Sequence, residues 1–122
     1  MAQLELEILG EIPEGLTEAM IAGWMKSACH SFPAVQLEVR FVEPEEIRNL
    51  NRTYRTKDES TDILEFPTAT ATKNEPVVHL GSIIVSAKDH YRKLGHDSSQ
   101  KEWKALIEHG LGNLVIYHEQ IS

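Results

Sequence analysis

The chain has 122 residues, of which 41% are hydrophobic and 25% are charged. These values are typical of a single soluble domain covering residues 1–122, and no stretch approaches the roughly 20 apolar residues of a membrane span. The net charge of −7 argues against a nonspecific nucleic-acid binder held by a basic surface, but it permits an enzyme with a locally basic cleft. The single cysteine, Cys29, excludes an internal disulfide and fits a cytoplasmic protein.

Four segments are predicted to be β-strands. Two of them, 3–9 and 35–42, alternate polar and apolar residues, which is typical of a half-buried strand. The predicted strands are 3–9, 35–42, 61–66 and 78–86, with a polar loop at 68–76.

Four helices are predicted from helical spacing and capping signals. They run from the cap at Thr17 to about Ser31, from Pro44 through Leu50, over 87–94 up to Gly95, and from the capping box Ser99-x-x-Glu102 to about Tyr117. The order β-α-β-α-β-β-α-α predicts an α+β or α/β sandwich, with one small mixed sheet of about four strands packed with helices.

A dense charged block precedes the third predicted strand. Residues 50–67 read LNRTYRTKDESTDILEFP, so that Arg52, Arg55 and Lys57 stand just before a buried-looking run. Arginine suits phosphate binding because its planar fork makes two parallel hydrogen bonds. The alternative is an ion-pair turn, in which Arg55, Lys57, Asp58 and Asp62 satisfy one another.

The last predicted helix carries an apolar stripe and a polar flank. The stripe consists of Trp103, Leu106, Ile107, Gly110, Leu111 and Leu114. His109 and Asn113 lie off this stripe, about 40° apart on a wheel of 100° per residue, and two ligands at this spacing are typical of a metal site. The alternative for His109 is an exposed helix histidine that has no role. Gly110 and Gly112 indicate either a helix that ends near Leu111 or a close approach of another backbone or a substrate.

Three segments resemble the YbeY family, bacterial metal-dependent endoribonucleases of ribosomal RNA maturation. The charged block is similar to the family's L-N-x-x-Y-R-x-K-D-x-P-T-D-V-L-S-F-P, and 80–85 is similar to L-G-D-I-V-I. Glu108-His109-Gly110 resembles the start of H-G-x-L-H-L-x-G-Y-D-H. The departures from these motifs are Ser60, Ile63, Glu65, Ser82 and, at the second histidine of the last motif, Asn113.

The resemblance implies a hydrolase of single-stranded RNA with a small mixed sheet. It implies that Arg55 contacts phosphate or the transition state, with Arg52 and Lys57 as further substrate-binding residues. The implied metal set is His109, Asn113 and Glu119, or His118 in the third place if one residue is lacking after Tyr117. Because an amide is a poorer zinc ligand than imidazole, zinc is expected to bind weakly or not at all. Strand alternation leaves the direction of the Glu65 side chain open.

The implied partners are ribosomal RNA and ribosomal proteins in the cytoplasm, with no DNA and no membrane. Two other hypotheses remain. One is a catalytically weak or inactive homologue that binds RNA or a ribosomal partner, and the other is a scaffold in which the charged block is only structural.

Overall fold

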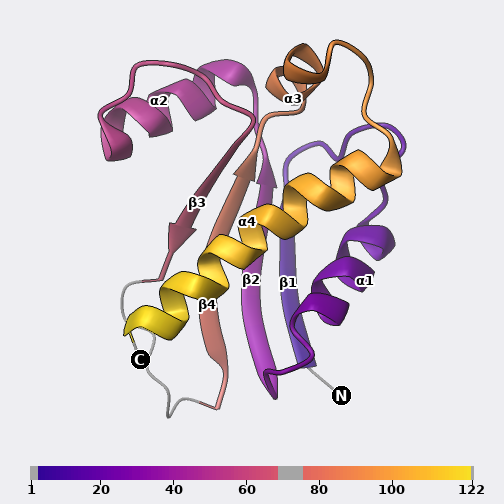
Figure 1. Ribbon diagram of the computed structural model, residues 1–122, viewed down its shortest axis with the longest axis vertical. Helices are drawn as coiled ribbons and strands as arrows, with labels where there is room; N and C mark the ends of the chain where they lie inside the picture. Colours follow the sequence, from indigo (N-terminus) through magenta and orange to yellow (C-terminus); the bar gives the residue numbers. More distant parts are fainter. Residues whose placement is uncertain (1–2, 69–75, 122) are drawn as a thin grey trace.

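The computed structural model describes residues 3–68 and 76–121 and has the predicted α+β architecture (Figure 1). The strands are β1 (Gln3–Leu9), β2 (Ala34–Phe41), β3 (Ile63–Pro67) and β4 (Val78–Val85). The helices are α1 (Glu18–Ala28), α2 (Pro44–Arg55), α3 (Ala87–Leu94) and α4 (Gln100–Ile121). The predicted order of elements is therefore confirmed, whereas most of the predicted loop at 68–76 lies outside the described residues.

The predicted capping signals set most of the helix ends. The Thr17 hydroxyl accepts a hydrogen bond from the Met20 amide at 3.1 Å at the start of α1. Ser99 and Glu102 form the reciprocal bonds of a capping box, at 3.0 and 3.2 Å, before α4. Gly95 ends α3 with a φ of 81°, a conformation that glycine adopts without strain.

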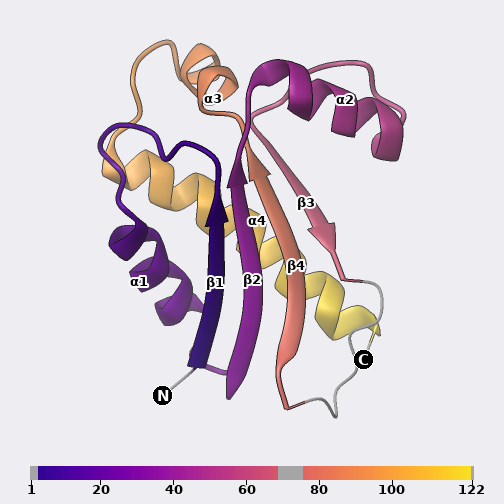
Figure 2. The ribbon, with the colours of Figure 1, turned by 180° about the vertical axis from the view of Figure 1, so that it is seen from behind.

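The sheet is mixed and has the strand order β1-β2-β4-β3. Strand β2 pairs in parallel with β1 and β4, whereas β3 pairs antiparallel with β4 and forms one edge. Helices α1 and α4 cover one face, and α2 packs on the other face near β3 (Figures 1 and 2). Ile47 of α2 meets Leu64 and Ile84 there in a small second core. Among the described helices, none combines the length and apolar composition needed to cross a membrane.

Helix α4 lies unusually close to the sheet at Gly110. A Cβ atom at this position would stand 2.8 Å from Ile63 Cδ1 and 3.1 Å from Ile83 Cγ2. The helix also buries Trp103, Ile107, Leu111 and Leu114, as the stripe predicted. It continues to Ile121, so the interpretation that it ends near Leu111 is wrong. Burial of the stripe offsets the helix cost of the two glycines, which is about 1 kcal/mol each.

Replacing each of the two glycines of α4 with alanine is expected to have opposite effects on stability. Gly110→Ala should lower the free energy of unfolding by about 1–3 kcal/mol, because its methyl group overpacks against the two isoleucines. Gly112→Ala is the matched control, since no atom lies within 4 Å of its Cβ position. It should raise stability by up to about 1 kcal/mol through helix propensity. Urea unfolding of both variants measures this, and equal effects would contradict the close approach.

Candidate functional site

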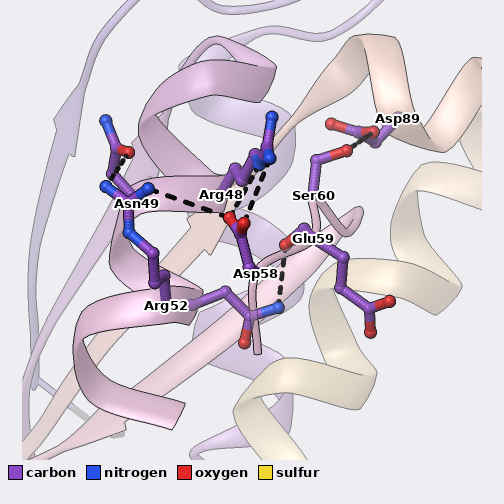
Figure 3. A network of polar contacts seen from close by, with 8 residues as sticks. Arg48, Asn49, Arg52, Asp58, Glu59, Ser60 and Asp89 are labelled. Carbon is purple, nitrogen blue, oxygen red and sulfur yellow. Dashed lines mark hydrogen bonds and ion pairs between the residues drawn. The ribbon is translucent and has the colours of Figure 1, made fainter. Parts of the chain in front are cut away.

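The acidic residues of the charged block are paired with groups other than Arg55 and Lys57. Asp58 accepts hydrogen bonds from the Arg48 guanidinium at 2.9 and 3.2 Å, and Arg52 Nη1 lies 3.8 Å from it (Figure 3). The Arg48 hydrogen bonds hold the pKa of Asp58 below its usual value. The buried Asp62 instead faces His90 Nδ1 and Lys93 Nζ, each at 3.7 Å.

The hypothesis that Arg55, Lys57, Asp58 and Asp62 form ion pairs with one another is therefore wrong, because both aspartates pair with other residues. The physical reason is that Arg55 is the last residue of helix α2 rather than part of a turn, and the chain reverses after it at Thr56, whose φ is 58°. The loop carries Asp58 back along the helix to Arg48, away from the helix end. Arg52 lies within this ion-pair network, while Arg55 forms no ion pair with any other described residue.

The loop after α2 is held by two further contacts that sequence reasoning missed. The buried Asn51 side chain donates to the Glu59 carbonyl at 2.9 Å. The Ser60 hydroxyl donates to Asp89 at 2.7 Å (Figure 3). In the sequence, the only sign of the Asn51 contact is that this asparagine lies on the otherwise apolar face of helix α2. Both contacts fix the loop relative to α2 and α3.

Arg55 is anchored at the free edge of β3. Its Nη2 donates to the backbone carbonyl of Glu65, and its Cζ lies 5.6 Å from the centre of the Phe66 ring. The side chain remains exposed, and together with Lys57 it lines a shallow groove of about 210 Å³ that also includes Glu59 and Thr61. Two exposed cations thus share one groove, and the guanidinium of Arg55 is oriented without a carboxylate partner.

The side chain of Glu65 points toward α4, a direction that strand alternation alone does not determine. Its Oε1 accepts a hydrogen bond from Asn113 Nδ2 at 2.8 Å, and the same Nδ2 lies 3.5 Å from His109 Nε2. Glu65 therefore contacts Arg55 through its backbone and Asn113 through its side chain. The end of α2, the edge of β3 and the C-terminal half of α4 lie on one side of the molecule in both views (Figures 1 and 2). Arg55 and the pair His109 and Asn113 lie on opposite faces of the sheet and are linked only through Glu65 at the edge of β3.

His118 and Glu119 are not part of this cluster. His118 follows His109 by nine residues in a continuous helix, which places it about 180° around α4. Its ring is buried and meets Phe32 edge-on, with 6.0 Å between the ring centres. Glu119 is exposed and lies about 80° from His109 in the direction away from Asn113. Because α4 does not bend back after Tyr117, neither residue returns to the His109 face.

The residues present do not fit a zinc centre with three imidazoles. The cluster offers one imidazole, one amide and the Glu65 carboxylate, and the Asn113 amide turns its Nδ2, a hydrogen-bond donor, toward the other two. Within the described residues there is no group of three or more His, Cys, Asp or Glu placed to hold a metal ion. A zinc site normally needs three good donors.

The fold and the site define a small α+β protein with an exposed arginine at the edge of its sheet and an exposed histidine on a long helix. The chain belongs to the YbeY family, whose model, described as Endoribonuclease YbeY, matches residues 7–120. The resemblance seen in the sequence is thereby confirmed.

Several curated relatives carry the name Endoribonuclease YbeY. The protein from Aquifex aeolicus is 41% identical over 90 residues, covering 70% of this chain and 58% of its own. The protein from Nitratiruptor is 32% identical over 121 residues, covering 97% of this chain and 69% of its own. A solution structure from Thermotoga maritima, 24% identical, shares the fold with a TM-score of 0.57 over 87% of this chain and 69% of that one. The chain spans about three-fifths of the relatives from Aquifex, Sulfurovum and Alkaliphilus, at 58%, 60% and 58% of their lengths.

The donor set predicts how zinc binding responds to substitution. The unaltered protein should purify with well under one equivalent of zinc. Asn113→His should raise the content toward one equivalent, because two imidazoles one turn apart would join the Glu65 carboxylate in a two-histidine, one-glutamate set. Elemental analysis of the purified proteins measures the content.

Glu119→His is the matched control for this prediction. It adds an imidazole to the same helix but off the His109 face, so the zinc content should not change. Stoichiometric zinc in the unaltered protein, or a rise caused by Glu119→His alone, would contradict the donor geometry.

Proposed function

We propose that the protein is an endoribonuclease of the YbeY type that hydrolyses phosphodiesters of single-stranded RNA, with ribosomal RNA as the substrate class. The observation that carries the proposal is the position of Arg55, which is fixed by the Glu65 carbonyl at the edge of β3, while the Glu65 side chain binds Asn113 beside His109 on the other face. The printed name of the relatives, Endoribonuclease YbeY, supports the same activity. The proposal extends to a cytoplasmic protein with ribosomal proteins as partners.

The chemistry of RNA cleavage matches the two cations near the edge of β3 and the histidine of α4. Cleavage of a phosphodiester builds negative charge on the nonbridging oxygens, and a fixed guanidinium stabilises that charge. Arg55 supplies such a group, and Lys57 adds a second cation in the same groove. The exposed His109 imidazole can accept or donate a proton at Nε2. Since the donor set does not fit three-imidazole zinc, no catalytic step is assigned to a metal.

A second candidate function is favoured by the position of Asn113. The Nδ2 of Asn113 binds Glu65 and also lies 3.5 Å from His109, so the amide stands between the carboxylate and the histidine. The negative charge of Glu65 opposes the approach of a phosphate to His109. The second candidate is therefore a homologue that binds RNA through Arg55 and hydrolyses it slowly or not at all.

Arg55→Ala tests the phosphate contact that both candidates share. It should weaken binding of a single-stranded ribosomal RNA fragment by about 1–3 kcal/mol, reduce the salt dependence of binding, and leave the melting temperature nearly unchanged. Fluorescence anisotropy at several salt concentrations measures the binding.

Arg48→Ala is the matched control for Arg55→Ala. It removes the same side chain from the same helix, but this guanidinium is paired with Asp58, so RNA binding should be retained. If Arg55→Ala unfolds the protein while the remaining folded fraction binds RNA normally, the arginine is structural and the proposal fails.

His109→Ala separates the two candidates. If the protein is an endoribonuclease, this variant should lower the cleavage rate of a single-stranded RNA about 100-fold or more, because it removes the proton-transfer group, while binding changes little. Single-turnover cleavage on denaturing gels measures the rate. Equal rates with and without His109, at the level of the RNA alone, would reject the enzyme and leave the RNA-binding homologue.

A further inference from the structure

Tyr54 is a large aromatic residue that remains 67% exposed in the last turn of α2. It directly precedes Arg55 in the sequence. An open aromatic ring next to an exposed cation is available to a ligand, because its face is not used in core packing.

The ring of Tyr54 is held in place without being covered. It meets the Phe66 ring at a centre-to-centre distance of 5.4 Å and an interplanar angle of 72°. Phe66 in turn packs on the second core, around Ile47 and Leu64, and the Arg55 guanidinium lies over its ring at 5.6 Å. One fixed phenylalanine thus positions both an exposed aromatic ring and an exposed guanidinium.

An aromatic ring and a cation in this arrangement suit two parts of a nucleotide, the base and the phosphate. Unpaired bases of single-stranded RNA stack on aromatic side chains, whereas bases in a duplex are already stacked on each other and are inaccessible. The adjacent phosphate is a ligand for arginine. We propose that Tyr54 is a stacking platform for one unpaired base of the RNA strand whose phosphate Arg55 contacts. This inference rests on the proposed function and adds to it a residue that selects single strands over duplexes.

Three proteins and two RNA probes test the platform. Dissociation constants of the unaltered protein, Tyr54→Leu and Tyr54→Phe are measured by anisotropy, with one single-stranded oligonucleotide and with the same sequence in a duplex. Tyr54→Leu should weaken single-strand binding about 5- to 100-fold, as expected for the loss of one base stack. Tyr54→Phe keeps the ring and should bind within about twofold of the unaltered protein. Duplex binding should be the same for all three.

A second measurement identifies the base directly. Single abasic sites are introduced along the oligonucleotide, one position at a time. At one position the abasic probe should bind the unaltered protein and Tyr54→Leu equally, because the base that stacks is already missing. At the other positions the difference between the two proteins should persist.

The outcomes distinguish this inference from the proposed function. If Arg55→Ala weakens binding but Tyr54→Leu does not, the platform is rejected and the phosphate contact stands. If neither variant weakens binding, both are rejected. If Tyr54→Phe loses as much as Tyr54→Leu, the hydroxyl group rather than the ring makes the contact, and stacking is rejected. Melting curves of each variant show that a loss of binding is not a loss of folding.

Discussion

The close packing of α4 on β3 and β4 at Gly110 determines where the candidate site lies. With no side chain at this position, the helix axis approaches Ile63 and Ile83 closely enough for neighbouring residues to reach the edge strand. His109 immediately precedes this contact, and Asn113 lies one turn further on. The hydrogen bond between Asn113 and Glu65 follows from this approach. A larger residue at 110 would move both polar side chains away from Glu65.

The edge strand β3 connects the two halves of the site. An edge strand leaves backbone groups unpaired, and here the Arg55 guanidinium binds the unpaired carbonyl of Glu65. The other arginines of α2 are engaged elsewhere, since Arg48 and Arg52 both face Asp58. An acidic protein can thus offer a local positive site, which reconciles the net charge of −7 with an RNA ligand.

The fold was largely predictable because its elements carry local signals. Alternation located β1 at its observed bounds, and Gly95 and the Ser99 capping box marked the ends of α3 and the start of α4. The direction of Glu65 was not predictable, since it depends on which face of β3 receives α4. The partner of Asp58 also depends on tertiary structure, because the reversal at Thr56 decides which arginine it meets.

The site was predictable only in part, for the same reason. Spacing along one helix correctly placed His109 and Asn113 one turn apart, within 3.5 Å of each other through Nε2 and Nδ2. Whether a third donor joins them depends on the path of the chain after Tyr117, which periodicity does not specify. The continuous helix to Ile121 takes His118 to the opposite face, against Phe32.

The central claim is that one RNA strand is bound across the edge of β3, between the end of α2 and the face of α4 that carries His109. An NMR titration of the isotopically labelled protein with a short single-stranded RNA tests this most directly. The account predicts that the signals of Arg55, Glu65, His109 and Asn113 shift together with one dissociation constant. Shifts confined to the separate groove around Glu11, Lys88 and Tyr91, with these four residues unchanged, would contradict it.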